Sequence, residues 1–174
     1  LIDNYRKETV QAIFLYPLNA LMEDQKARME KLLAGTELKF AVYNGDMPQY
    51  IPSPEDFNYK KVMRKVDAIK GITRDKDGNI IETKFPHVIA TREELRQHPA
   101  NILLTNPTML EYILLREKDR NLIKEDKKTL RWIALDETHT YTGAGAAEIA
   151  MLIRRVLMAY GVTTNDVRFA TSSA

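Results

Sequence analysis

Short apolar runs alternate with longer helix-forming stretches along most of the chain. The apolar runs are rich in Val, Ile, Leu and aromatic residues, which is typical of strands buried on both faces of a sheet. They cover residues 10–16, 38–43, 101–105, 132–135 and 167–170. The stretches between them predict helices at residues 18–34, 91–97, 108–115, 119–128 and 143–160. Brief strands that alternate with helices imply right-handed crossovers, so the pattern predicts an α/β fold with a mainly parallel sheet and helices on both faces.

Capping residues mark the ends of several predicted helices. Gly35 follows the first helix, where glycine commonly ends one. Thr91 and Glu94 have the spacing of a capping box, and Pro107 precedes its helix at a position where proline is tolerated. In the last helix the apolar positions recur every three or four residues and predict a buried face of Ala146, Ile149, Ala150, Ile153, Val156, Leu157 and Tyr160. The pattern fits a RecA-like ATPase core, although periodicity alone allows any doubly wound fold.

Residues 47–86 interrupt this alternation and predict a surface insertion. Three prolines make its first part irregular: Pro48, Pro52 and Pro54. Residues 58–69 predict a basic helix, and residues 72–84 predict a β-hairpin because an Asp-Gly turn separates two alternating arms.

Basic side chains crowd into this insertion. They are Lys60, Lys61, Arg64, Lys65, Lys70, Arg74 and Lys76, and they face the acids Asp67, Asp75 and Asp77. Such a patch can contact phosphates of a nucleic acid. A plain solvated surface is the favoured interpretation, because runs of charge usually have no other meaning.

Composition narrows the class of protein. With 174 residues the chain is about one domain, long enough to bury a core. Its net charge of +2 gives no general field for nucleic acid, so any such surface must be local. The absence of cysteine excludes disulfides and cysteine-bound zinc and fits a reducing cytoplasm. No apolar stretch is long enough to span a membrane, so no membrane partner is expected.

The run of residues 132–135 ends abruptly in Asp136 and Glu137, followed by Thr138 and His139. Ligands of open α/β sheets bind at the carboxyl ends of strands. In nucleotide hydrolases an Asp at such a point holds Mg²⁺, and a neighbouring carboxylate orients the attacking water. The alternative is that the two acids only cap the following helix, and the tetrapeptide alone does not decide between these interpretations.

Several stretches together resemble the first motor domain of superfamily-two helicases of the DExH type, and most closely the large helicase-related (Lhr-like) DNA helicases and their bacterial repair and defence relatives. Residues 16–25 (YPLNALMEDQ) resemble motif Ia, and residues 104–110 (LTNPTML) resemble motif Ib. Residues 43–46 (YNGD) resemble the glycine-containing turn after the next strand. Residues 136–139 (DETH) match motif II, and residues 170–174 (ATSSA) resemble a motif III that stops early.

The resemblance implies catalytic roles for four residues. Asp136 is expected to hold Mg²⁺, through water, because this ion prefers oxygen ligands and keeps much of its hydration. Glu137 is expected to orient, or take a proton from, the water that attacks the γ-phosphate of ATP. His139 is expected to communicate with Ser173 and with a second motor domain. Thr138 stands where alanine is commoner, and its hydroxyl is expected to alter this coupling.

The resemblance also implies a nucleic-acid-binding half of the site. Thr105, Asn106 and Pro107 link a strand to a helix amino terminus, where free backbone amides and a hydroxyl can hold a phosphate. Pro17 and Asn19 are expected to play the corresponding part after the first strand, although many relatives carry arginine in place of Asn19. Gly45 is expected to let the backbone of a nucleic acid approach closely. The alternative is that these loops only connect a strand to the following helix and bind no phosphate.

No phosphate-binding loop of the pattern GxxxxGK(S/T) occurs in the sequence. The resemblance implies that it precedes Leu1, so residues 1–174 are interpreted as part of a first motor domain. The parent protein is expected to couple Mg-ATP hydrolysis to translocation on, or unwinding of, nucleic acid, with DNA favoured over RNA. Its partners are then that nucleic acid and the second motor domain of the same chain. The 174 residues alone are expected to show negligible ATPase activity.

Three other functions remain open on the sequence alone. The first is an ATP-driven DNA translocase of a restriction or phage-defence system, which shares the same motifs. The second is a non-catalytic nucleic-acid-binding module, which the intact pair Asp136 and Glu137 disfavours. The third is a hydrolytic metal site on Asp136, Glu137 and His139, which is disfavoured because the only other histidines are His87 and His98.

Overall fold

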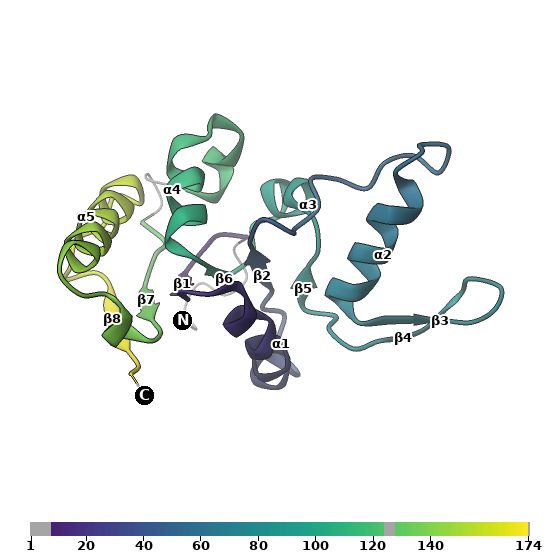
Figure 1. Cartoon of the computed structure of the whole chain (residues 1–174), viewed down its shortest axis with the longest axis horizontal. Helices are drawn as coiled ribbons and strands as arrows, with labels where there is room; N and C mark the ends of the chain where they lie inside the picture. The colour runs from purple at the N-terminus through teal and green to yellow at the C-terminus, as the bar shows by residue number, and fades with distance from the viewer. Residues whose placement is uncertain (1–7, 124–127, 174) are drawn as a thin grey trace.

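The computed structural model describes residues 8–123 and 128–173 of the chain. Its strands are β1 (Ala12–Leu15), β2 (Phe40–Tyr43), β3 (Ile72–Arg74), β4 (Ile80–Thr83), β5 (Val88–Ile89), β6 (Ile102–Thr105), β7 (Trp132–Leu135) and β8 (Arg168–Thr171). Its α-helices are α1 (Asn19–Leu33), α2 (Tyr59–Lys70), α3 (Arg92–Gln97), α4 (Pro107–Leu115) and α5 (Ala144–Ala159) (Figure 1). Within the described ranges, every helix is too short or too polar to cross a membrane.

Six strands form one parallel sheet in the order β5-β2-β6-β1-β7-β8. The central strands are paired without offset at their carboxyl ends. Leu15 at the end of β1 lies beside Thr105 of β6 and Leu135 of β7, and the same register continues to Tyr43 of β2 and Thr171 of β8. The predicted α/β fold with a mainly parallel sheet is confirmed.

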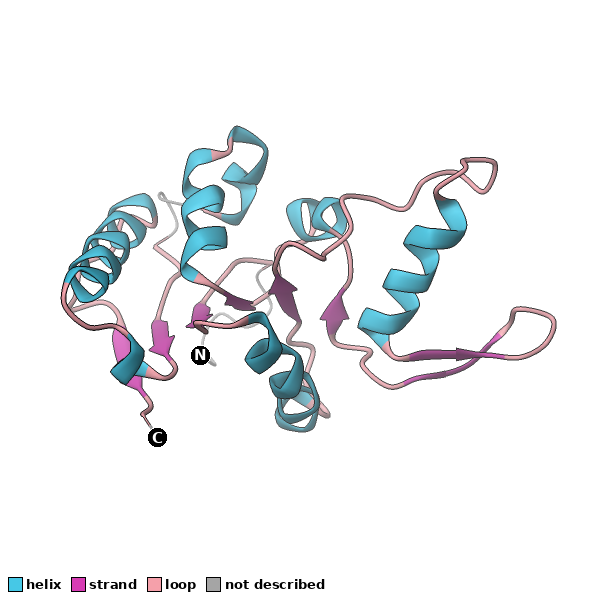
Figure 2. Ribbon diagram, in the orientation of Figure 1, coloured by secondary structure: helices cyan, strands magenta, loops and turns pink. Residues whose placement is uncertain are grey.

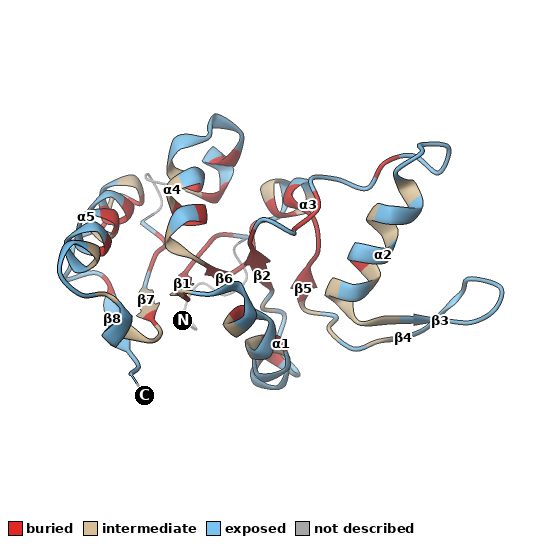
Figure 3. Ribbon diagram, viewed as in Figure 1, coloured by how far each residue is buried: buried red, intermediate tan, exposed pale blue. Residues whose placement is uncertain are grey.

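Helices cover both faces of this sheet, as predicted, but unequally. One face packs Ile13, Leu103 and Ile133 against apolar side chains of α3, α4 and α5. The other face packs Phe40 and Leu104 against α1, which lies under the half of the sheet that contains β2 and β6 (Figures 1 and 3). The β7–β8 half of that second face is left partly open, and all four residues of the edge strand β8 are exposed.

Three features differ from the pattern-based prediction. Strand β5 was not predicted, because it has only two residues and its pairing with β2 is not visible in the local sequence. The helix predicted at residues 119–128 is instead a 3-10 helix at Glu117–Leu122, and residues 124–127 lie outside the described ranges. On α5, Ala146 and Ala150 are exposed, whereas Leu152 is buried. The helix turns its larger side chains to the sheet, because burial of leucine stabilises more than burial of alanine.

The hairpin predicted in the 47–86 region is present. Strands β3 and β4 are antiparallel, and with α2 they project away from the main sheet (Figures 1 and 2). The Asp75 carboxylate accepts hydrogen bonds from the backbone N–H of Asp77 (2.9 Å) and of Asn79 (2.8 Å), and Gly78 takes the left-handed conformation that the turn requires. Arg74 holds α2 to the hairpin through hydrogen bonds to both carboxylate oxygens of Asp67 (2.8 and 2.9 Å).

A buried carboxylate joins the sheet to the helices on its more fully covered face. Asp119 is fully buried in the 3-10 helix. It accepts a hydrogen bond from the Tyr43 hydroxyl (2.9 Å) and another from Nε of Arg96 (2.7 Å). A buried charge is tolerated only when it is paired and hydrogen-bonded in this way. The three residues therefore fasten the end of β2 to α3 and to the 3-10 helix.

Replacing Asp119 should destabilise the fold strongly. We expect Asp119→Ala to lower the free energy of unfolding by about 3 kcal/mol or more, because it leaves a largely buried guanidinium and a buried phenol without their acceptor. Urea denaturation followed by circular dichroism measures the change. Glu37→Ala, which removes an exposed acid, should stay within about 0.5 kcal/mol of the unaltered protein. Equal stability of the two variants would contradict the role assigned to Asp119.

Candidate functional site

The aligned strand ends bring the predicted site residues to one edge of the sheet. Pro17 and Asn19 follow β1, Gly45 follows β2, Asn106 and Pro107 follow β6, Asp136 and Glu137 follow β7, and Ser173 follows β8. Backbone hydrogen bonds continue past the strands: the Tyr16 N–H donates to Thr105 O and the Asp136 N–H donates to Leu15 O, both at 2.9 Å. Segments up to 156 residues apart in sequence (Pro17 to Ser173) therefore meet along this edge.

The acidic part of the edge is joined to the end of β8. The backbone N–H of Ser172 donates to Leu135 O at 3.0 Å, which extends the ladder by one residue and sets Ser172 beside Asp136. The Ser172 hydroxyl donates to Asp136 Oδ1. Sequence reasoning selected the neighbouring Ser173 and missed Ser172. The β7–β8 register would have identified it, but that register depends on the folded sheet.

His139 lies between two other predicted residues. Its Nδ1 is 3.2 Å from Oε2 of Glu137 and 3.2 Å from Oγ of Ser173. Glu137 itself has a left-handed backbone (φ 51°), which costs a non-glycine residue about 1 kcal/mol or more. Thr140 stabilises this turn, because its N–H and its hydroxyl both donate to Glu137 O, at 2.9 and 2.8 Å.

Thr138 makes a connection that alanine could make only in part. Its backbone N–H and its hydroxyl both donate to the carbonyl oxygen of Ser172, at 2.9 and 3.0 Å. An alanine at this position would keep the first hydrogen bond and lose the second. The departure from the commoner residue therefore adds a link between the loops that follow β7 and β8.

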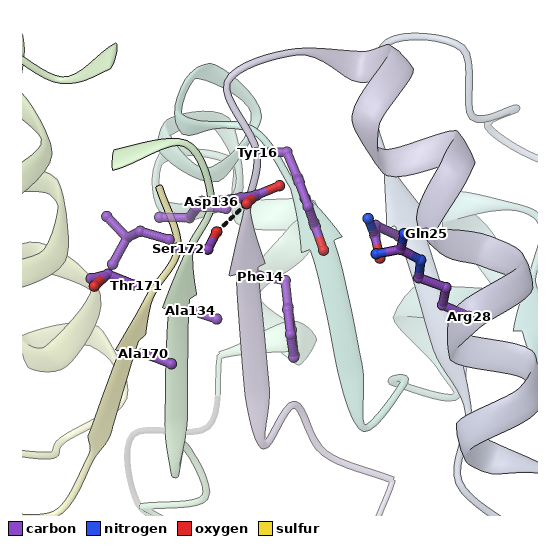
Figure 4. Close-up of a pocket in the computed structure, with 11 residues that line it drawn as sticks. Phe14, Tyr16, Gln25, Arg28, Ala134, Asp136, Ala170, Thr171 and Ser172 are labelled. Atoms are coloured by element: carbon purple, nitrogen blue, oxygen red, sulfur yellow. Dashed lines mark hydrogen bonds between the residues drawn. The ribbon is translucent and has the colours of Figure 1, made fainter. Parts of the chain in front are cut away.

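A cavity of about 310 Å³ lies beside Asp136 on the partly open face of the sheet (Figure 4). Its floor is formed by Phe14, Ala134 and Ala170 from three adjacent strands. Gln25 and Arg28 of α1 form the opposite wall, across from Asp136, Tyr16 and Ser172 (Figure 4). Sequence reasoning did not select Arg28, because nothing in a run of helix-forming residues shows which one faces a cavity.

Burial and the negative charge of Asp136 raise the pKa of two nearby tyrosines, Tyr16 and Tyr141. Burial, followed by the negative charge of Asp136, raises the pKa of Tyr16 to about 12, and Arg28 acts in the opposite direction. The same two causes, in the same order, raise the pKa of Tyr141. The Tyr141 hydroxyl is buried without a hydrogen-bond partner in the part of the chain that is described. The Asp136 carboxylate thus accepts a hydrogen bond from Ser172 and lies near the phenols of Tyr16 and Tyr141.

The loops after β1 and β6 are tied together. Asn106 caps α4, because its Oδ1 accepts a hydrogen bond from the N–H of Met109 at 2.8 Å, and Pro107 occupies the first turn. The amide nitrogen of the same side chain, Nδ2 of Asn106, donates a hydrogen bond to Oδ1 of Asn19 at 2.9 Å. Both asparagines remain accessible, and Pro17 is half-buried beside them.

Thr105 points its side chain into the sheet. The residue is fully buried, and its hydroxyl donates to Tyr43 O at 2.8 Å. Its side chain therefore joins β6 to β2 and has no free surface for a phosphate. A strand-end threonine in a sequence does not reveal this, because the acceptor is supplied by a residue 62 positions away.

The Gly45 loop is held from behind by buried groups. Oδ1 of Asn44 accepts hydrogen bonds from the backbone N–H of Asp46 (3.0 Å) and of Met47 (3.1 Å). Nη2 of Arg92 donates to Asn44 O at 2.9 Å. Gly45 is exposed, and a Cβ placed on it would meet nothing within 4 Å, so the space above this residue is open.

Metal-binding capacity at the edge is small. Over residues 8–123 and 128–173, no three or more His, Cys, Asp or Glu side chains are grouped so as to hold a metal ion. The Asp136 carboxylate and the Ser172 hydroxyl are hard oxygen donors of the kind that suits Mg²⁺ with most of its water retained.

A parallel sheet in this order, with acids after one strand and capped loops after its neighbours, defines a RecA-like fold. No protein-family profile matches the chain. It is 27% identical to the Druantia protein DruE of Escherichia coli (strain UMEA 4076-1), over 94% of this chain and 12% of DruE. It is 25% identical to the uncharacterized ATP-dependent helicase YprA of Bacillus subtilis (strain 168), over 96% of this chain and 17% of YprA.

Solved structures agree with these relatives. The crystal structure of the DUF1998 helicase MrfA matches 97% of this chain and 20% of that protein, with 27% identity and a TM-score of 0.58. A further MrfA structure, bound to DNA and AMPPNP, matches 97% and 18%, with 26% identity and a TM-score of 0.57. Helicase Lhr of Mycobacterium smegmatis shares the fold, at 16% identity and a TM-score of 0.56 over 98% of this chain and 18% of Lhr. The resemblance to superfamily-two, Lhr-like helicases is confirmed, and the chain spans at most a fifth of these proteins.

The position of Asp136 beside Tyr16 predicts a shift in titration. The ordinary tyrosine pKa is 10.0, so the folded Tyr16 keeps its proton at a pH where the unfolded chain has lost it. This contribution to stability is complete below pH 10 and is lost as the pH rises towards about 12. In Asp136→Asn we expect the pKa of Tyr16 to fall but to stay above 10, because burial, the larger cause, remains.

NMR titration of ¹³C-labelled tyrosines measures this shift. Tyr160 is the internal control, because burial alone raises its pKa. A Tyr16 pKa that is the same in Asp136→Asn as in the unaltered protein would show that the two side chains are not close in solution.

Proposed function

We propose that this chain is part of the first motor domain of an ATP-dependent DNA helicase. The single observation that carries the proposal is the in-register sheet edge, which gathers the acids after β7, the hydroxyls after β8 and the capped loops after β1, β2 and β6. The relatives YprA and MrfA are named as helicases. The whole protein's activity, its cytoplasmic location and its second motor domain are parts of this proposal.

In the acidic half, we assign two tasks to two carboxylates. Asp136, which also accepts a hydrogen bond from Ser172, holds Mg²⁺ through water. Glu137 orients the attacking water and accepts its proton, because its carboxylate follows the same strand and stays partly accessible. Bound Mg-ATP supplies the phosphoryl group whose hydrolysis drives the motor. The sequence contains no motif for the loop that cradles its phosphates, and the proposal assigns that loop to another part of the parent protein.

In the proposed motor, His139 and Thr138 connect the acids that follow β7 to the serines that follow β8. His139 contacts both Glu137 and Ser173, so a change in the charge or position of Glu137 alters a hydrogen bond at the end of β8. Thr138 couples the same two segments through the carbonyl of Ser172. The second motor domain would receive the signal from the β8 side of the edge.

In the nucleic-acid half, we assign phosphate contacts to the exposed loop groups. These are the side-chain amides of Asn19 and Asn106, and Gly45 with its open space. Pro17 and Pro107 are assigned the shaping of these loops through their fixed φ, because a proline nitrogen has no N–H to donate to a phosphate. Such contacts position a strand without reading its sequence. DNA is favoured because two structures of MrfA are bound to DNA. Thr105 is assigned a supporting role, since its buried hydroxyl sets the distance between the loops after β2 and β6.

A translocase of a restriction or phage-defence system is the alternative that shares every one of these assignments. It differs only in the absence of strand separation, so duplex unwinding by the whole protein distinguishes the two. A non-catalytic binding module is the less favoured choice, because the hydrogen-bonded cluster of Asp136, Glu137, His139 and both serines is complete.

Replacing Glu137 tests the proposal. In the whole protein, with its phosphate-binding loop and second motor domain, Glu137→Gln should lower ATP turnover by about 100-fold or more, because it removes the proton acceptor and keeps the shape of the side chain. ATP binding should change little. A coupled ATPase assay and equilibrium binding of a fluorescent ATP analogue measure the two effects.

The matched control is Glu148→Gln, which makes the same chemical change at an exposed position of α5. It should turn over ATP at the unaltered rate. Turnover by Glu137→Gln at the rate of this control would remove Glu137 from the mechanism.

A further inference from the structure

A second groove begins where the proposed nucleic-acid contacts end. It has a volume of about 380 Å³ and lies between the Gly45 loop and helix α2. Its lining includes Gly45, Asp46, Tyr50, Asp56, Lys61 and Lys65. Gly45 is therefore shared between the groove and the sheet edge described above.

The α2 side of the groove carries uncompensated positive charge. Lys61 and Lys65 are four residues apart, so they project from the same side of the helix, and both are exposed. Ion pairs in the described part of the chain involve Lys70 and Arg74 but neither Lys61 nor Lys65. Lys60 and Arg64, which are exposed on the adjoining side of α2, also lack an ion pair there. An excess of unpaired cations on one helix attracts a polyanion.

The groove also offers an aromatic surface. Tyr50 lies on the groove wall with 54% of its surface exposed, although its ring is large and apolar. An exposed ring beside lysines is the combination that binds single-stranded nucleic acid, because bases stack on the ring while the cations contact phosphates. A duplex would not use the ring in this way, since its base faces are already stacked on each other.

Two acids oppose this attraction and must be weighed. Asp56 is engaged in a local turn, where its Oδ1 accepts a hydrogen bond from the N–H of Asn58 at 2.7 Å. Asp46 is exposed beside Gly45 and has no ion pair within the described ranges. The charges of the lining are thus balanced in number, so the binding proposed below depends on direct contact of Lys61 and Lys65 with phosphates more than on the general field of α2.

The order of the strands shows where the groove lies relative to the other site residues. From β7 towards β5, the edge presents the Asp136 acids, then Pro17, then Asn106, then Gly45, and then the groove. We propose that the groove formed by the Gly45 loop, Tyr50 and α2 extends the nucleic-acid track, and that Lys61 and Lys65 bind two further phosphates of a single strand that leaves Gly45. This inference rests on the proposed function. It gives the basic part of the 47–86 region a binding role in place of a merely solvated one.

Oligonucleotides of two lengths test the inference. We would measure fluorescence anisotropy of labelled oligo-dT of about six and about twelve nucleotides over a series of KCl concentrations, using the protein without other changes. The longer strand should bind more tightly and with a steeper salt dependence. In Lys61→Gln with Lys65→Gln, affinity for the longer strand should fall about tenfold, and the slope of log K against log[salt] should shrink by about 0.7 for each lost contact. Affinity for the shorter strand should stay unchanged.

Matched variants separate position from net charge. Lys60→Gln with Arg64→Gln removes the same charge from the same helix outside the groove and should weaken binding much less. Tyr50→Ala should weaken binding of the longer strand about tenfold, whereas Tyr50→Phe should preserve it. Asp46→Asn should tighten binding, because it removes a negative charge from the phosphate path.

Two negative results have different meanings. If the unaltered protein binds both strands, but the Lys61 and Lys65 variant behaves like the Lys60 and Arg64 variant, the groove is not part of the track and the inference is overturned while the proposed function stands. If the unaltered protein binds neither strand, the proposed function and the inference both fail. Asn19→Ala with Asn106→Ala reports on the proposed function alone, since it should weaken both lengths equally.

Discussion

The parallel pairing of β1 with β6 on one side and β7 on the other determines the rest of the structure. Leu15, Thr105 and Leu135 end these three strands side by side, so the loops that follow them emerge at the same height. A slip of one residue would turn every side chain of a strand to the opposite face and would draw its loop back from the edge. The buried apolar faces on both sides of the sheet forbid such a slip, and hydrophobic burial thereby fixes the position of the polar site.

Polar side chains then connect neighbouring loops in pairs. The loops after β7 and β8 are joined by Thr138, Ser172, Asp136 and His139, whereas the loops after β1 and β6 are joined by the amide pair Asn19 and Asn106. Each pair spans adjacent strands of the sheet. One link lies among the acids and hydroxyls after β7 and β8, and the other lies among the loops after β1 and β6. In the loop after β7, the left-handed backbone of Glu137 is a strained conformation for a residue other than glycine.

The lobe of α2 and its hairpin adds to this edge in a different way. The lobe adds no strand to the main sheet and stands out from it, yet its basic helix flanks the loop that carries Gly45. Buried polar groups behind that loop, from Arg92 to Asn44 and from Asp119 to Tyr43, hold the loop in place. The loop that carries Gly45 thus lies between buried polar groups on one side and the exposed, charged side chains of α2 on the other.

Local interactions could be predicted from the sequence, because both partners of each lie within a few residues of one another. They include the helix cap at Thr91, the proline at the start of α4, the Asp-Gly turn of the hairpin and the placement of Asp136 and Glu137 directly after a buried strand. Tertiary structure alone decided the burial of Thr105, the contact of Ser172 with Asp136, the pairing of β5 and the choice of Leu152 over Ala150 for the core. In each of these the partner lies on another strand or helix, 36 residues away for Ser172 and 62 for Thr105. A one-dimensional pattern states which residues prefer burial or a polar partner, but only the order and register of the strands determine which partner each one meets.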